Sequence, residues 1–159
     1  MPTHAKNKKA FFNYSIEDTI EAGIVLAGHE VKSIREGQVS LEGSYASIRN
    51  GEAFLRNAYI GKYKRATNLE SYDENRERKL LLHKHEINKL IGKAKEKGLT
   101  LVALEIYTSK RRIKVKIGIA KGKKQFDKRE SIKKKESKRK IEREIGLMVN
   151  LDCWNCGKM

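Results

Sequence analysis

The most regular alternation of apolar and polar residues in this chain runs through residues 113–120. Four branched apolar residues alternate there with lysines and small residues: Ile113, Val115, Ile117 and Ile119 with Lys114, Lys116, Gly118 and Ala120. A period of two is typical of a strand that buries one face and exposes the other to water. The pattern therefore predicts a strand that carries its lysines outward. It continues without a proline into a basic segment that begins at Lys121.

The first third of the chain predicts two more strands and a short helix. Residues 10–16 are rich in aromatic side chains, which favours a strand. Residues 21–27 form a β-branched run typical of a buried strand. Residues 30–36 place two apolar side chains three positions apart, which predicts one or two helical turns. The polar, basic residues 1–9 are expected to be mobile.

Two hairpins are expected. Residues 43–60 contain Asn50-Gly51, a dipeptide that tolerates the positive φ values of a type I′ turn between paired strands. Residues 100–107 and 113–120 are joined by the polar segment TSKRR, and we expect them to pair in antiparallel fashion.

The rest of the chain predicts a loop and two helices. Residues 61–78 are charged, show no clear period and are expected to form a long surface loop. Residues 84–97 have apolar side chains at i, i+3, i+4 and i+7, followed by Gly98 at the position that ends a helix. Residues 130–148 favour a helix, but an isolated helix of that length is marginal in water, so we expect it to fold on binding.

These elements predict the fold class. About five short strands with one central helix, and no βαβ alternation, argue against a parallel sheet. We expect a mainly β protein with helices, an OB-fold-like antiparallel β-barrel with accompanying α-helices and a basic C-terminal tail. An open α+β sandwich is the alternative. The expected division is a barrel domain at residues 1–122 and a tail at 123–159 that is disordered when free.

Charge changes the picture from fold to partner. The formal net charge is +16, of which +7 lies in residues 1–112 and +8 in residues 121–143. A clustered basic segment points first to nucleic acid. Membrane binding is the weaker explanation, because residues 121–143 hold only three large apolar side chains and no apolar run could span a bilayer. No secretory signal is present at the start, so we expect a cytoplasmic protein.

Little in the sequence supports catalysis or a metal site. His83 and His85 stand two residues apart with no third ligand nearby. Cys153 and Cys156 have a CxxC spacing, but a second ligand pair and a thioredoxin-like context are absent. No glycine-rich phosphate loop, HExxH motif or nucleophile with a base is found. We therefore expect no enzyme activity, no cofactor and no metal.

Three kinds of side chain have both a plain and a functional interpretation. Lys114 and Lys116 would usually form an ordinary solvated strand face, but their continuation into a basic tail favours a polyanion. Glu21 could be a surface glutamate or an acceptor for base amino groups and 2′-hydroxyls. Leu81 stands in a run of three leucines, at least one of which must point outward from a strand; taken alone, it is expected in the core.

Several segments resemble the SsrA-binding protein family, also called the small protein B family. The similarity runs in unbroken order over about residues 5–143, and no single motif carries it. The segments are NKKA at 7–10, EAGIVLAGHEVKSIR at 21–35, GSYA at 43–46, NGEAFL at 50–55, RKLLLHKHEI at 78–87, GLTLVAL at 98–104 and KVKIGIAKGKKQFDKR at 114–129.

The resemblance implies a protein that binds transfer-messenger RNA (tmRNA) and takes it to bacterial ribosomes stalled on messages without a stop codon. The barrel would hold the tRNA-like domain, and the tail would enter the empty messenger RNA channel near the small-subunit decoding site and become helical there. Alanyl-tRNA synthetase and elongation factor Tu would be indirect partners through tmRNA. The alternative is a general OB-type RNA-binding or ribosome-associated protein.

The resemblance also assigns residues. The family's RNA-contacting residues fall on Glu21, Leu81 and Lys114, and we also expect RNA contacts from Asn7, Lys8 and Lys9 and from Lys116 on the exposed strand face. The residues that the resemblance implies to act on the ribosome are Lys123, Lys124, Phe126, Asp127, Lys128 and Arg129, and we expect Lys121 at the start of the basic segment to act with them. Two features depart from the family. Phe126 stands where members often have histidine, which leaves stacking but no hydrogen bond, and residues 146–159 are more apolar than such a tail is expected to be.

Overall fold

The structure is a computed structural model that describes residues 2–66, 71–96, 98–123, 136–137, 139–141 and 143. The chain divides into two units, Met1–Gly122 and Lys123–Met159. In the described residues of the first unit, nine strands and three helices follow one another in this order: β1 Thr3–Lys6, α1 Lys8–Asn13, β2 Tyr14–Ile24, α2 Gly28–Arg35, β3 Val39–Ser40, β4 Tyr45–Arg49, β5 Glu52–Arg56, β6 Tyr59–Ile60, β7 Arg78–Leu81, α3 Lys84–Lys95, β8 Leu99–Ser109 and β9 Arg112–Gly122.

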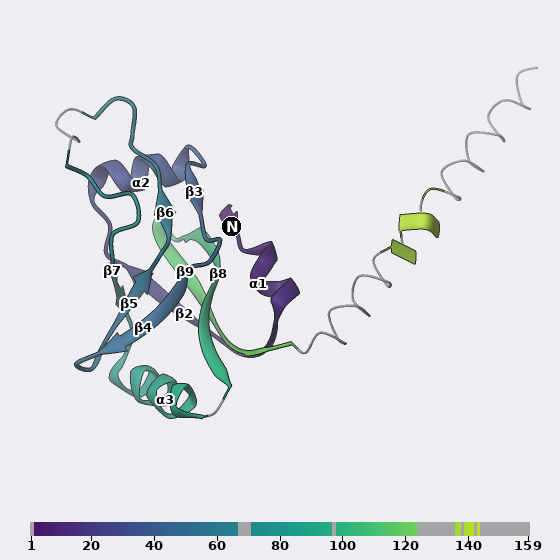
Figure 1. The fold of residues 1–159 in the computed structure, drawn as a ribbon. Helices are drawn as coiled ribbons and strands as arrows, with labels where there is room; N and C mark the ends of the chain where they lie inside the picture. Colours follow the sequence, from purple (N-terminus) through teal and green to yellow (C-terminus); the bar gives the residue numbers. More distant parts are fainter. Residues whose placement is uncertain are drawn as a thin grey trace, which may run out of the picture. The chain divides into compact units, whose positions relative to one another are not determined.

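Seven of these strands form one antiparallel sheet that closes on itself (Figure 1). The order is β1-β8-β4-β5-β7-β2-β9, and β9 also pairs with β8, so the six strands from β8 to β9 make a ring. Strand β1 extends the free part of one edge of β8, and β3 pairs separately with β6. Closure removes exposed sheet edges. The predicted class, a mainly β protein with an OB-fold-like antiparallel barrel and accompanying helices, is confirmed.

The two longest pairings give the ring its curvature. Strands β8 and β9 pair from Leu99–Lys121 to Ser109–Arg112, and β2 pairs with the other edge of β9. Register shifts interrupt β8 between Ala103 and Glu105 and β2 soon after Ile16. Such irregularities bend a strand and increase its twist, which helps a sheet to close.

Both predicted hairpins are present. Strands β4 and β5 are joined through Asn50 and Gly51, whose φ values of 54° and 73° fit the expected turn. The turn between β8 and β9 contains Lys110 and Arg111, also at positive φ. The two helices predicted in residues 30–36 and 84–97 correspond to α2 and α3; α3 ends at Lys95.

More residues of β9 are buried than the alternating sequence pattern predicted. Side chains of the apolar set point into the ring, where Val115 and Ile117 are fully buried. Gly118 and Ala120, expected on the water side, are buried too, because α1 and β8 cover that end of the strand. A Cβ atom on Gly118 would lie 2.8 Å from Leu104 Cδ1, so the close approach of Leu104 requires glycine. Only the lysine end of this face meets solvent.

The N-terminal prediction is wrong in two respects. Residues 3–6, expected to be mobile, form β1 and pair with β8. Residues 8–13 form a helix although aromatic residues favour a strand there. The Asn7 side chain accepts a hydrogen bond from Ala10 N at 2.9 Å and so caps α1. Strand β2 begins only at Tyr14 and replaces the separate strand expected at residues 21–27.

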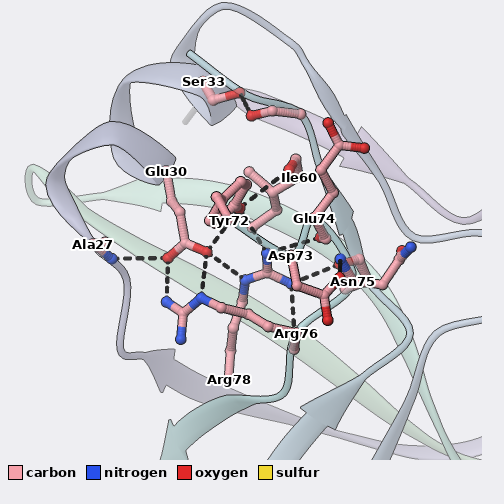
Figure 2. A network of polar contacts seen from close by, with 12 residues as sticks. Ala27, Glu30, Ser33, Ile60, Tyr72, Asp73, Glu74, Asn75, Arg76 and Arg78 are labelled. Carbon is pink, nitrogen blue, oxygen red and sulfur yellow. Dashed lines mark hydrogen bonds and ion pairs between the residues drawn. The ribbon is translucent and has the colours of Figure 1, made fainter. Parts of the chain in front are cut away.

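A buried ion-pair network joins α2 to the segment before β7 (Figure 2). Glu30 Oε1 accepts from Arg78 Nε at 2.9 Å, and both carboxylate oxygens accept from Arg76, at 2.9 and 2.6 Å. The Tyr72 hydroxyl lies 3.0 Å from Glu30 Oε1. Glu30 and Arg78 are completely buried. The segment 61–78 was predicted as a surface loop, but its last residue, Arg78, belongs to β7 and is completely buried.

Burial alone would raise the pKa of the Glu30 carboxyl. The hydrogen bonds from Arg76, the Ala27 N–H and the charge of Arg78 outweigh that effect and lower its pKa to about 2. Glu30 is therefore ionised throughout the physiological range, and the network carries fixed charges.

The described residues of the second unit are few. Residues 136–137, 139–141 and 143 are helical and exposed, within the segment where a helix was expected. The predicted contacts at Lys124, Phe126, Asp127, Lys128 and Arg129, and the CxxC pair, lie outside the described residues. Within the part of the chain that is described, no helix has the length and apolar character needed to cross a membrane.

Candidate nucleic-acid interface

Strands β2, β7 and β9 bring three predicted residues together in one groove of about 690 Å³. Gly23 of β2 pairs with Leu81 of β7 on one side and with Lys114 of β9 on the other. Glu21 lies two positions earlier on β2, on the same face. These residues are far apart in sequence, and the register of the ring places them side by side.

Gly23 allows the groove to form at this point. A Cβ atom there would lie 3.2 Å from Leu81 Cβ, so a larger residue would push against the leucine. Leu81 points outward and is 56% exposed, whereas Leu80 is buried. An exposed leucine beside cationic groups is suited to pack against the face of a base or ribose.

Glu21 and Lys114 form an exposed ion pair with 3.2 Å between Lys114 Nζ and Glu21 Oε2. The buried Tyr107 hydroxyl and then Lys114 hold the pKa of the Glu21 carboxyl below its usual range, although the hydroxyl makes no hydrogen bond of good geometry. Burial, followed by the charge of Glu21, raises the pKa of Tyr107. Glu21 is thus a charged acceptor that can orient Lys114 or bind an RNA donor.

Lys116 lies on β9 two residues after Lys114, on the same face of the strand. Its Nζ is 3.9 Å from Glu105 Oε2, and the same carboxylate is 3.0 Å from Lys6 Nζ. Lys116 and Lys6 therefore share Glu105 as an acidic partner, and Lys116 is not among the residues that line the groove.

The groove contains cations that sequence reasoning missed. Arg111 and Arg112, from the turn between β8 and β9, line it together with His83. The segment TSKRR was interpreted only as a polar connection, and its run of three cations at a strand turn was the available signal. The rings of His83 and His85 are stacked, with centroids 5.6 Å apart.

The predicted set at residues 7–9 lies elsewhere. Asn7 is 4% exposed, and its amide donates to Leu41 O and Ala103 O at 2.6 and 3.0 Å. Its side chain is fully used in joining α1 to the barrel, so its place in the molecule is structural. Lys9 is exposed and ion-paired with Glu42, and Lys8 is exposed.

Two more predicted residues that the structure describes are Lys121, near the end of β9, and Lys123, just after it. Lys121 is exposed and Lys123 is half-buried. Lys121 pairs with Ser15 of β2 and Leu99 of β8, at the end of β9 opposite the groove. Lys114 and Lys121 therefore lie near opposite ends of one strand.

Comparisons with known proteins give a consistent result. The family model described as SmpB protein matches residues 4–146. The chain is 54% identical to an SsrA-binding protein of Acetivibrio thermocellus, over 89% of this chain and 91% of the relative. It is 58% identical to an SsrA-binding protein of Orientia tsutsugamushi, over 85% and 88%. A solved structure described as "tmRNA-SmpB: a journey to the center of the bacterial ribosome" matches with a TM-score of 0.66 and 48% identity, over 79% of this chain and 87% of that one.

Proposed function

The chain belongs to the SmpB protein family, and we propose that its barrel binds tmRNA and brings it to stalled ribosomes in trans-translation. It is an RNA-binding protein, and tmRNA and the ribosome are its partners. The observation that carries this function is the groove in which Glu21, Leu81 and Lys114 meet. We place this activity in the bacterial cytoplasm, and we propose that the protein acts as an adaptor without catalysis.

The groove is suited to a folded RNA because it offers several kinds of contact within a small area. Lys114, Arg111 and Arg112 supply charge for phosphates, and Leu81 supplies an apolar surface. Glu21 can accept hydrogen bonds from base amino groups or 2′-hydroxyls. Contacts to phosphates alone would not distinguish these groups. Such a set recognises the shape of a tRNA-like elbow and discriminates against an unstructured strand.

The second part of the proposal concerns the division of the chain. Residues 1–122 hold the RNA, and residues 123–159 enter the empty messenger RNA channel near the decoding site. Lys123 is the first residue of that segment, and Lys121 lies two residues before it, near the end of β9. Joining two binding segments in one chain makes the second contact effectively intramolecular after the RNA has been delivered. Alanyl-tRNA synthetase and elongation factor Tu act on the same complex through tmRNA.

The test separates the two parts. Lys114→Glu should abolish binding to the tRNA-like domain of tmRNA, measured by titration of labelled RNA. Lys93→Glu on α3 is the matched control, since Lys93 is also an exposed, ion-paired lysine and the charge change is the same. Truncation after Gly122 should leave RNA binding intact and eliminate tagging of stalled peptides.

Two outcomes would contradict the proposal. If the truncated protein loses RNA affinity as severely as Lys114→Glu, the division at residue 122 is wrong. If poly(U) competes as well as the tRNA-like domain, the chain is a general single-strand binder and the groove does not read RNA shape.

A further inference from the structure

The exposed cations of the first unit differ in whether an acidic side chain already neutralises them. Most cations on β7, β9 and α3 are ion-paired, among them Lys79, Lys89, Lys93, Lys114 and Lys116. Five exposed cations on α2 and in residues 61–66 form no ion pair with any residue that the structure describes: Lys32, Arg35, Lys62, Lys64 and Arg65. We call these five side chains the α2–loop surface.

The two segments that carry this surface are bound to each other. Ser33 Oγ donates to Gly61 O at 2.6 Å, and Gly61 N donates to Gln38 O at 2.9 Å. Lys32 Nζ lies 5.4 Å from the centre of the Tyr63 ring. Figure 1 shows α2 and the chain that follows β6 at the same end of the barrel. The five cations therefore belong to one face.

The buried network removes one negative charge from this face, although Asp73 and Glu74, later in the same loop, are exposed and half-buried. Glu30 is turned into the interior, where Arg76 and Arg78 neutralise it (Figure 2). Within residues 28–38 and 61–66, Glu36 is then the one exposed acidic residue against five cations. Tyr72 and Arg76 contact Glu30 from the far side of the loop, and this contact holds the end of the loop against α2.

The surface adjoins the groove. Val31 of α2 lines the groove, and Lys32 is the next residue of the same helix. Arg111 and Arg112, the groove cations from the β8–β9 turn, also form no ion pair with a described residue. A cation without an acidic partner can bind a phosphate without first breaking an ion pair, and each such contact releases counterions.

We infer that the α2–loop surface is a second RNA contact, which binds backbone phosphates of a structured RNA next to the groove. The inference rests on the proposed function and extends it to residues that the family resemblance did not assign. Tyr63 adds an aromatic side chain between the cations, which can pack against a ribose or base. The phosphates belong either to tmRNA itself or to ribosomal RNA, and the experiment below distinguishes the two.

The test compares two triple variants of the full-length protein with equal loss of charge. Lys62→Gln, Lys64→Gln and Arg65→Gln remove three cations of the surface. Arg49→Gln, Lys89→Gln and Lys93→Gln remove three exposed cations that already have acidic partners. A second surface variant, Lys32→Gln with Arg35→Gln, tests the helix side. Thermal unfolding of each variant establishes that it folds.

Affinity is measured against salt in two arms, one with the isolated tRNA-like domain and one with ribosomes and the preassembled tmRNA complex. Each lost phosphate contact reduces the slope of log affinity against log salt by roughly 0.7 to 0.9, so the surface triple variant should lower the slope by about 2. Affinity at about 0.1 M salt should fall about tenfold relative to the control triple variant.

A loss in the first arm assigns the phosphates to tmRNA, and a loss confined to the second arm assigns them to ribosomal RNA. Equal behaviour of the surface and control variants in both arms would overturn the inference. The proposed function fails separately, when the unmodified protein does not bind the tRNA-like domain or Lys114→Glu leaves binding unchanged.

Discussion

Two glutamate–cation pairs in this barrel have the same chemistry and opposite surroundings. Arg78 Nε lies 2.9 Å from Glu30 Oε1, and both side chains are fully buried. Glu21 and Lys114 are 3.2 Å apart, with exposed fractions of 54% and 37%. In the first pair, Glu30 also accepts from Arg76 and Arg78 also donates to Ala58 O and Glu74 O, whereas the second pair faces an open groove. Burial therefore determines which pair can exchange its partner.

The energetic difference follows from solvation. An exposed ion pair contributes little to stability, so Lys114 can leave Glu21 for a phosphate at small cost. A buried charge that loses its partner has neither water nor a counter-charge, and removing one member of such a pair is strongly destabilising. The Glu30 pair is thus suited to fix the loop before β7, and the Glu21 pair to bind a ligand.

The largest expected effect is that of Glu30→Ala. It leaves Arg78 buried without its carboxylate, and we expect the free energy of unfolding to fall by about 3 to 5 kcal/mol in urea denaturation. Glu36→Ala, an exposed glutamate next to the same helix, is the control and should change stability by less than about 0.5 kcal/mol. Similar losses for both variants would show that the buried network has no special structural role.

The second-largest expected effect is the loss of stability at low pH, because acid protonates Glu30 in the same network. The pKa of Glu30 is about 2 in the folded protein and 4.5 for an unperturbed glutamate, so its stabilisation is complete above pH 4.5 and is lost as pH falls toward 2. The difference corresponds to on the order of 3 kcal/mol.

Glu30→Gln cannot titrate, so the free energy of unfolding of this variant should depend less steeply on pH between 5 and 2 than that of the unmodified protein. The other carboxylates titrate equally in both proteins and cancel in the comparison. Parallel stability curves for the two proteins would contradict the assigned pKa.

The smallest expected effect on stability is that of Glu21→Gln. Because the pair with Lys114 is exposed, the free energy of unfolding should change by less than about 1 kcal/mol. Affinity for the tRNA-like domain should fall, since the neutral amide no longer orients Lys114. Chemical denaturation and RNA titration on the same sample measure both. A large loss of stability in Glu21→Gln would contradict the conclusion that the exposed Glu21 pair, unlike the buried Glu30 pair, contributes little to folding.

The sequence predicted elements whose signals are local. The Asn50-Gly51 turn, the apolar period of α3 and the pairing of β8 with β9 needed no tertiary information. The strand predicted from the aromatic residues near the N-terminus was wrong, because one buried side chain, Asn7, caps a helix at residues 8–13 that those residues did not indicate. Local propensity is overridden where a distant strand supplies the hydrogen-bond acceptors, as β8 does for Asn7.

The candidate site was less predictable. Glu21, Leu81 and Lys114 were named through family resemblance, and only the register through Gly23 shows that they lie side by side. Arg111 and Arg112 were missed because their placement depends on where a turn lies over the barrel. Nothing in the sequence around Glu30 indicated that it is buried, because its partners come from a segment more than forty residues away.

Strand β9 has one more consequence. It begins beside the groove, ends at Gly122 opposite Tyr14, and is hydrogen-bonded on both edges to β2 and β8. At about 3.3 Å per residue, the eight steps from Lys114 to Gly122 span about 26 Å that cannot stretch or fold. The strand is therefore a rigid spacer of fixed length. It fixes the distance between the groove proposed to bind RNA and the point where the chain leaves the barrel, and a two-residue change in its length would shift that distance by about 7 Å while every side chain kept its face.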